Sequence, residues 1–192
     1  MKLVVIDACV RGPQSRTWRV AREVIEALSH RYEVVQFHLP AMKMEPLSPS
    51  ALSDRNLCGV VPQWARDAAT QIASADRILV AAPFWDMSFP SCLKVFIEHT
   101  SLLGITFDTD DRKCYGLCRC TKLLYITTRG MDIPTGDPLD GGTSYLRALS
   151  QLWGLGEVEV LSCRNMDYGT PAQIEGKIQE AVLKGREIAK TF

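Results

Sequence analysis

Continuous apolar runs alternate along the chain with stretches in which apolar residues recur every three or four positions. Such runs are typical of strands buried on both faces of a parallel sheet. Recurrence at three or four positions is typical of amphipathic helices. The runs predict five strands, at residues 2–8, 32–39, 76–83, 121–130 and 157–163. The periodic stretches predict five helices, at residues 15–29, 62–75, 90–103, 143–153 and 171–190.

Capping residues support several of these helix boundaries. Ser15 can cap the first helix, because a serine side chain accepts a hydrogen bond from a free N–H group of the first turn. Pro62 and Pro171 stand at the starts of two others, where the absent N–H would have had no helical partner. Residues 40–60 are rich in proline, serine and methionine and are expected to form a loop.

Strands separated by helices predict a parallel sheet covered on both faces. We expect an α/β fold, a flavodoxin-like doubly wound five-stranded sheet of order 2-1-3-4-5, with residues 1–192 forming a single domain. Folds of this kind bind ligands beyond the carboxyl ends of the strands, where the strand order reverses. That rule identifies three candidate loops, at residues 8–17, 83–90 and 127–143.

Composition narrows the class of ligand. The chain has 192 residues, 46% of them hydrophobic, with 22 basic and 22 acidic side chains and a formal net charge of zero. No block of like charge occurs, which argues against nucleic acid or an anionic membrane as the main partner.

No apolar run approaches the roughly 18 residues of a membrane span, and the N-terminal run is too short for a signal peptide. A cytoplasmic location and free cysteines are therefore expected.

Three closely spaced cysteines, in the segment CYGLCRC, raise the question of a metal or iron–sulfur site. Cys114, Cys118 and Cys120 follow a Cys-x3-Cys-x-Cys spacing, which differs from the Cys-x2-Cys of zinc and ferredoxin-like sites. No histidine lies nearby. Ordinary buried thiols are favoured, and no metal is expected.

The first candidate loop, ACVRGPQSRTW, has the features of a phosphate site. Helix N-termini present unpaired N–H groups and a positive dipole end. Arg11, Ser15, Arg16 and Thr17 would add positive charge and hydroxyl donors. The loop carries neither a dinucleotide fingerprint nor a P-loop motif, so it favours a mononucleotide. The alternative is that Ser15 is a plain cap beside surface arginines.

The second loop, PFWDMSFP, places large apolar side chains where a strand ends. Phe84, Trp85 and Met87 could pack on the face of a flat heteroaromatic ligand at the expected ligand edge. A hydrophobic lid or a dimer contact is the alternative.

The third loop, TTRGMDIPTGDPLDGG, is long and polar, and Thr127, Thr128 and Gly130 would permit close backbone approach. Its alternative is a loop that is simply long.

The segments SRT, APFWDMSFPSCLKVFIEHTSLLGITF and YITTRG resemble the FMN-dependent NAD(P)H oxidoreductases of the azoreductase and quinone reductase type. The resemblance covers nearly the whole chain. It implies non-covalent FMN, NADH or NADPH as co-substrate, a quinone, azo compound or similar flat acceptor, ping-pong kinetics and a homodimer with the flavin near the subunit interface. With Arg11 from the loop itself, the expected cofactor-binding residues are Arg11, Ser15, Arg16, Thr17, Pro83, Phe84, Trp85, Asp86, Met87, Thr128, Arg129 and Gly130.

No side-chain acid, base or nucleophile is expected in the reaction, since flavin chemistry needs binding, orientation and electrostatics from the protein. Backbone N–H groups or Arg129 are candidates to stabilise negative charge on a reduced flavin. The helix at 90–103, with Phe96, Ile97 and Leu103, is a candidate dimer face, or else simply half core.

Three departures from the resembling family bear on the substrate. Met131 stands where a second glycine is frequent, and Asp86 stands where asparagine is frequent. The polar segment 108–113 replaces an aromatic that often lines the substrate pocket. An alternative function is a flavodoxin-like electron carrier or FMN-binding regulator without NAD(P)H turnover, although carriers tend to be strongly acidic and this chain is neutral.

Overall fold

Five parallel strands form the central sheet. The structure is a computed structural model that describes residues 1–192, apart from the side chain of Cys58. The sheet strands are β1 (Lys2–Asp7), β2 (Glu33–His38), β3 (Arg77–Ala81), β6 (Lys122–Thr128) and β7 (Glu157–Cys163). They lie in the order β2-β1-β3-β6-β7, so the order reverses between β1 and β3.

The predicted order 2-1-3-4-5 needs a correction, because the described residues form seven strands and the order in the sheet is 2-1-3-6-7. The additional strands β4 (Phe107–Thr109) and β5 (Cys114–Gly116) form a separate antiparallel hairpin between the third and fourth sheet strands. Three residues are too few to give a readable alternation of apolar and polar positions. The five predicted strand segments are the five strands of the sheet.

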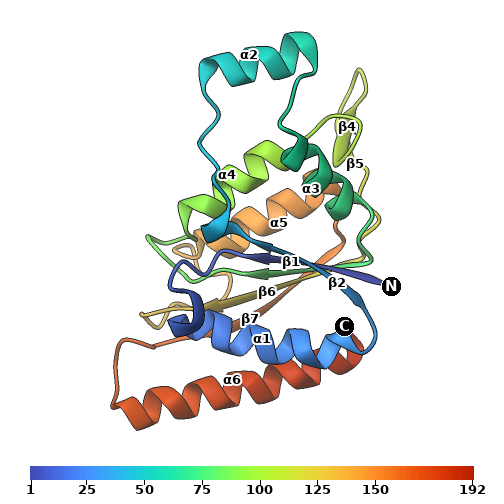
Figure 1. The fold of residues 1–192 in the computed structure, drawn as a ribbon. Coiled ribbons are helices and arrows are strands. Elements are labelled where there is room, and N and C mark those ends of the chain that lie inside the picture. Colours follow the sequence, from blue (N-terminus) through green and yellow to red (C-terminus); the bar gives the residue numbers. More distant parts are fainter.

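Helices cover both faces of the sheet (Figure 1). On one face lie α1 (Arg16–Ser29) and α6 (Pro171–Thr191). On the other lie α3 (Gln63–Ala73), α4 (Ser91–Thr100) and α5 (Gly141–Trp153). Two short 3-10 turns, η1 (Gly12–Gln14) and η2 (Leu39–Ala41), follow β1 and β2. The molecule is therefore a three-layer, doubly wound α/β fold.

The helix starts follow from capping residues in the sequence. The Ser15 side chain accepts a hydrogen bond from the Trp18 N–H at 3.3 Å, as predicted for the first helix. Thr170 and Gln173 form a reciprocal capping box at the start of α6, with Pro171 in its first turn. The caps at Ser15 and Thr170 therefore also mark where the preceding loops end.

The prediction that residues 40–60 form only a loop was wrong. Helix α2 (Pro49–Cys58) occupies the second half of that segment. The Ser48 side chain caps it by accepting from the Ala51 N–H, and Gly59, with φ of 64°, ends it. Leu52 and Leu57 are exposed, so the helix has no buried stripe to reveal it as a periodic pattern. In Figure 1 it stands apart from the sheet on two extended segments.

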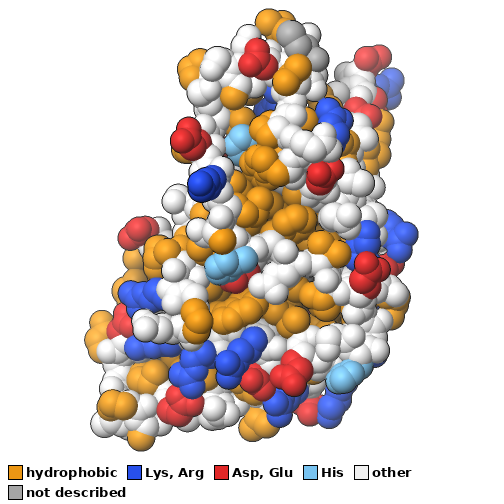
Figure 2. Space-filling model, in the orientation of Figure 1, with side chains coloured by type: hydrophobic (Ala, Val, Ile, Leu, Met, Phe, Trp, Pro, Cys, Tyr) orange, Lys and Arg blue, Asp and Glu red, His pale blue; other side chains and the backbone are white. Residues whose placement is uncertain are grey.

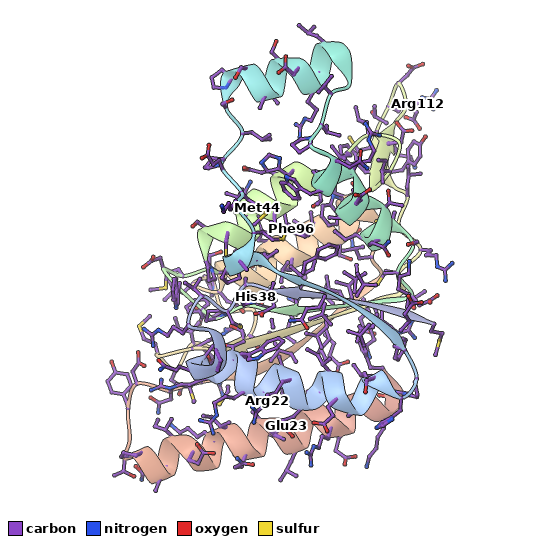
Figure 3. All side chains as sticks on the ribbon, viewed as in Figure 1. Arg22, Glu23, His38, Met44, Phe96 and Arg112 are labelled. Atoms are coloured by element: carbon purple, nitrogen blue, oxygen red, sulfur yellow. The ribbon has the colours of Figure 1, made fainter. Side chains whose placement is uncertain are left out.

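Helix α4 packs one side into the core, which was the alternative interpretation of this helix. Phe96 is fully buried and lies 5.5 Å from the Phe37 ring and 6.4 Å from the Trp64 ring, between ring centroids. Figure 3 shows it between α4 and the sheet. Ile97 is also buried, whereas Leu103 lies beyond the helix and is 62% exposed. Of the three residues, only Leu103 remains accessible to a partner.

Surface charges gather on one helical layer. On the face shown in Figure 2, Lys and Arg side chains concentrate over α1 and α6, and hydrophobic side chains gather above them towards α2. Arg19 pairs with Glu175 and Arg186 pairs with Glu23 across these two helices. Among the residues that the structure describes, no helix is both long enough and apolar enough to cross a membrane.

Candidate active site

The loops after β1, β3, β6 and β7 meet at the carboxyl ends of the sheet strands and enclose a pocket of about 390 Å³. This edge lies on the left of the sheet in Figure 1. The pocket is lined by Arg11, Gln14, Ser15, Arg16, Pro83, Phe84, Trp85, Asp86, Thr128, Arg129, Gly130, Met166 and Asp167. The three loops named from the sequence therefore converge on one cavity.

All predicted cofactor residues line this pocket except Thr17 and Met87. Thr17 is fully buried, and its hydroxyl lies 2.7 Å from that of Thr128. It therefore joins the first loop to the third from behind the pocket wall. Met87 is 41% exposed at the tip of the second loop. Neither side chain is part of the cavity lining.

One end of the pocket is the N-terminus of α1. Helix α1 is 14 residues long, and its N-cap Ser15 and first residue Arg16 line the cavity, so its free N–H groups and positive dipole end lie at the pocket. Ser15 is 4% exposed, and Arg11 and Arg16 line the same region. Arg16 Nη1 donates to the Met166 carbonyl at 2.7 Å and to Asp167 Oδ1 at 3.2 Å. This end of the pocket therefore contains two arginines and one carboxylate, that of Asp167, which pairs with Arg16.

A buried carboxylate anchors the first loop from below. Asp7 is 2% exposed at the end of β1 and accepts from the Cys9 N–H at 2.9 Å. Its other oxygen lies 2.6 Å from Nδ1 of His38. His38 is the last residue of the edge strand β2 and is labelled in Figure 3. Asp7 is not part of the pocket lining, so its contacts fix the loop and do not face a ligand.

The cysteines near the pocket are not activated. Burial raises the pKa of the Cys9 thiol far above its usual value, and nearby Asp7 raises it further. Burial likewise raises the pKa of Cys92. Both side chains are therefore protonated thiols at neutral pH, which disfavours either of them as a nucleophile.

The second loop contains a two-residue turn in an uncommon conformation. Trp85 and Ser88 exchange both backbone hydrogen bonds, at 3.2 and 2.8 Å. The residues between them, Asp86 and Met87, have φ of 47° and 64°. Positive φ at both central positions is the pattern of a type I′ turn, which ordinarily contains Asn-Gly or Asp-Gly. The sequence lacks glycine here, so it gave no signal for this turn.

The two aromatic residues of the loop have different surroundings. The Phe84 N–H donates to the Thr128 carbonyl at 3.1 Å, and its ring centroid lies 5.1 Å from the Arg129 guanidinium carbon. Phe84 is thus held in the wall by both backbone and side chain. Trp85 is 36% exposed and makes no comparable contact among the described side chains. Trp85 is therefore the exposed aromatic side chain of the pocket wall.

Arg129 does not present its charge to the pocket. Its guanidinium is fully buried and donates to the carbonyls of Ile133 and Pro134, at 2.9 and 3.0 Å, and to Asp140 Oδ2 at 2.7 Å. Its backbone N–H donates to Cys163. A buried carboxylate thus neutralises the Arg129 guanidinium, which favours backbone N–H groups, the other predicted candidates, for stabilising charge on a ligand.

Sequence reasoning missed a fourth loop, which follows β7. The N–H groups of Asn165, Met166 and Asp167 donate in succession to the carbonyls of Met131, Arg129 and Gly130. The loop is thereby fixed against the third loop and adds Met166 and Asp167 to the pocket. The rule that ligands bind at the carboxyl edge applies equally to the loop after the fifth sheet strand, and would have identified it.

The polar segment 108–113 lies away from the pocket. It forms the turn and flanks of the β4–β5 hairpin, and Figure 3 shows Arg112 at the tip of that hairpin, on the opposite side of the molecule from the strand ends. Its side chains do not line the cavity of their own chain.

The cysteine cluster consists of individually placed thiols. Cys118 and Cys120 donate to the carbonyls of Thr106 and Lys122, and burial raises their pKa to about 12 and about 11. Cys114 is exposed. Within the part of the chain that the structure describes, no group of His, Cys, Asp or Glu side chains has the geometry to hold a metal ion.

Comparison with known proteins agrees with this architecture. A family model described as a flavodoxin-like fold matches residues 1–188. An FMN-dependent NADH:quinone oxidoreductase of Clostridium perfringens is 34% identical over 124 residues, which span 65% of this chain and 62% of that protein. A protein of the same description from Lachnoclostridium phytofermentans is 28% identical over 184 residues, 93% and 92% of the two chains.

Solved structures extend the similarity to the whole chain. The crystal structure of an azoreductase from Bacillus anthracis superposes with a TM-score of 0.84 at 16% identity, covering 100% of both chains. A second B. anthracis structure, an FMN-dependent NADH-azoreductase in complex with FMN, has a TM-score of 0.82 at 18% identity, covering 99% and 98%. At these identities, the likeness shows a common fold.

Proposed function

Because the chain belongs to the family with the flavodoxin-like fold, we propose that it is an FMN-dependent oxidoreductase. It would transfer a hydride from NADH or NADPH, through FMN, to a quinone, an azo compound or a similar flat acceptor. The observation that carries this proposal is one pocket with a cationic helix N-terminus at one end and an exposed tryptophan in its wall. The names of the relatives, NADH:quinone oxidoreductases and azoreductases, support the reaction class.

The residues of the pocket fit FMN. A cavity of about 390 Å³ is within the usual range for small-molecule sites. Ser15 and Arg16, with the free N–H groups of the first turn of α1, suit a phosphate. Trp85 and Pro83 offer apolar surface to a flat ring, and Gly130 leaves the third loop without a side chain beside it. Arg11 would add charge at the phosphate end.

FMN, when bound, supplies the two-electron chemistry that couples oxidation of a nicotinamide to reduction of the acceptor. The chain's own residues bind and orient the reactants. Trp85 is the one exposed aromatic residue in the lining, so a nicotinamide and an acceptor would occupy its neighbourhood in turn. That arrangement supports a ping-pong mechanism. Since the Arg129 charge is neutralised by Asp140, stabilisation of negative charge would come from backbone N–H groups.

The proposal includes a cytoplasmic homodimer in which residues 1–192 act as one FMN-binding domain. Six described cysteines are free thiols, which suits a reducing compartment. The homodimer rests on the resemblance to azoreductases and quinone reductases. Thr128, Asp86 and Met87 are retained as flavin neighbours, Met87 through its backbone, and Thr17 as a residue that positions Thr128.

Initial-rate kinetics test the proposal. The FMN-loaded protein is assayed for NADH and NADPH oxidation with menadione, at several fixed concentrations of each substrate. Turnover that requires added FMN, with parallel double-reciprocal lines, is the expected result. FMN that binds without nicotinamide-dependent turnover would instead identify an electron carrier or regulator, and converging lines would exclude ping-pong.

A further inference from the structure

We propose that the buried Arg129–Asp140 ion pair is a positioning element for the flavin pocket. It holds the Asp86–Met87 turn in its left-handed conformation and so sets how tightly the pocket binds a flavin ring. This inference rests on the proposed FMN site. It assigns a role to two residues that do not themselves contact the ligand.

The ion pair is completely enclosed. Arg129 and Asp140 both have fully buried side chains, and Arg129 Nη2 lies 2.7 Å from Asp140 Oδ2. The other Nη hydrogens of the guanidinium reach the carbonyls of Ile133 and Pro134 and the Thr143 hydroxyl, while its Nε is buried without a hydrogen-bond partner among the described residues. A buried charge is tolerated only when it is paired and hydrogen-bonded, so each partner depends on the other.

Asp140 connects this pair to helix α5. Its Oδ1 accepts from the Thr143 N–H at 3.1 Å, which makes it the N-cap of α5. Its Oδ2 also accepts from the Gly136 N–H at 3.0 Å. One carboxylate therefore fixes both the loop before α5 and the first turn of that helix.

The first turn of α5 lies directly against the second loop. The Gly141 N–H donates to the Met87 carbonyl at 3.0 Å. A Cβ on Gly141 would lie 2.8 Å from that carbonyl oxygen, which is closer than real Cβ atoms approach. Glycine at this position thus permits the helix start and the turn to touch, and the helix start is where Asp140 stands.

The turn needs such support. Asp86 and Met87 have φ of 47° and 64°, a region that non-glycine residues enter at a free-energy cost. Methionine has neither the missing Cβ of glycine nor the short polar side chain of asparagine, so nothing in the residue itself favours this left-handed conformation. A conformation of this kind persists only where the surroundings fix it. The Gly141 contact on Met87 supplies that constraint, and Arg129 adds another through the Phe84 ring.

The consequence for ligand binding is specific to the ring. Trp85 and Asp86 line the pocket and belong to the turn, whereas Ser15 and Arg16 belong to another element. Loosening this clamp, the series of contacts from the Arg129–Asp140 pair through Gly141 to Met87, should therefore weaken binding of the isoalloxazine ring and leave the phosphate end intact. A general loss of structure would weaken both ends.

The test compares Asp140→Asn with Asp137→Asn. Asp137 lies in the same loop and accepts the Leu139 N–H, but has no contact with Arg129, so it is a matched control. Dissociation constants are measured for FMN and for lumiflavin, which has the ring without the phosphate chain. We expect Asp140→Asn to weaken lumiflavin binding about tenfold or more, and Asp137→Asn to leave it unchanged.

A rescue experiment separates positioning from general stability. Met87→Gly creates Asp-Gly, which favours the type I′ turn by itself. In the Asp140→Asn background, this change should restore lumiflavin affinity to within about threefold of the Met87→Gly single variant. Lumiflavin affinity unaffected by Asp140→Asn, or a loss that Met87→Gly fails to rescue, overturns the proposal.

A readout without ligand keeps the two proposals distinguishable. The Ser88 amide, which donates to Trp85, should exchange hydrogen faster in unliganded Asp140→Asn than in the wild type or Asp137→Asn. If the wild type binds no flavin, the proposed function fails, and equal exchange rates would separately overturn the clamp. Should Asp140→Asn not fold, Gly141→Ala replaces it. Gly176→Ala is then the control, because an added Cβ at this helical glycine would meet no atom within 4 Å.

Discussion

At the residue scale, the site depends on a few side chains whose surroundings differ from what their identity suggests. Arg16 and Arg129 are both arginines of the pocket, yet one has a 40% exposed side chain and the other is fully buried and neutralised. Trp85 and Phe84 are adjacent aromatics, yet only Trp85 is exposed. The sequence predicted most, but not all, of the residues that gather here, and contacts between distant loops decide which of them are open to the pocket.

The phosphate assignment predicts a difference between two flavins. Replacing Ser15 and Arg16 together by alanine removes a hydroxyl and a guanidinium at the N-terminus of α1. FMN affinity should fall by about 2–3 kcal/mol, whereas riboflavin, which lacks the phosphate, should lose much less. Isothermal titration with both ligands measures this, and equal losses for the two would remove the assignment.

Asp167 should weaken FMN binding. It pairs with Arg16 at 3.2 Å, and both side chains are largely exposed, so the pair itself contributes little. A phosphate at Arg16 would compete with this carboxylate and be repelled by it. Asp167→Asn should therefore tighten FMN binding about tenfold at low salt, and less at high salt. Riboflavin serves as control, and an FMN affinity that is unchanged or lower would count against the placement of the phosphate.

Trp85 should contribute through stacking. Its exposed face in the pocket wall is the surface on which a flat ring can lie. Trp85→Ala should cost about 1–3 kcal/mol of ring affinity, by analogy with base stacking on aromatic side chains. Trp85→Phe should lose less. Fluorescence titration with FMN and lumiflavin measures both variants, and unchanged affinity in Trp85→Ala would contradict the assignment.

At the scale of elements, local signals predicted what local interactions determine. The strands were recognised because burial on both faces makes them continuously apolar, and α1 because Ser15 caps an apolar stripe. Helix α2 and the β4–β5 hairpin were missed because they bury little, so neither imposes a period on the sequence. The Asp86–Met87 turn was missed for a different reason. Its conformation is imposed by Gly141, a residue more than fifty positions away.

The acid stability of the protein should report on α5. Burial alone would raise the pKa of Asp140, but hydrogen bonds from Thr143 and Gly136, together with Arg129, hold it below its ordinary value. A carboxyl with a depressed pKa in the folded state contributes stability above its unfolded pKa of about 3.9. That contribution is lost as the pH falls through the lower, folded value.

Urea denaturation between pH 7 and pH 3 measures this contribution. The wild type should lose stability more steeply below about pH 4 than Asp140→Asn, which has no proton to bind there. Asp140→Asn itself should be less stable at pH 7, by about 3–5 kcal/mol, because it leaves the Arg129 charge buried without a counterion. Parallel pH profiles for the two proteins would show that Asp140 does not have the depressed pKa.

At the scale of the whole molecule, the pocket is a consequence of topology. The order β2-β1-β3-β6-β7 reverses direction at β1, so the loops after β1 and β3 diverge and leave a crevice between them. The alternation of strands and helices was sufficient to predict this crevice before any motif was considered. The loop after β7 closes one side of this crevice through three backbone hydrogen bonds to residues 129–131. The sequence pattern of neither segment predicts these hydrogen bonds.

The proposed function requires that this pocket bind FMN and pass electrons from a nicotinamide to a flat acceptor. An anaerobic spectrum of the FMN-reconstituted protein between 350 and 500 nm tests this requirement. We expect flavin peaks that bleach when NADH or NADPH is added and return when menadione follows. Flavin that stays oxidised with both nicotinamides, or a protein that takes up no flavin, would contradict it.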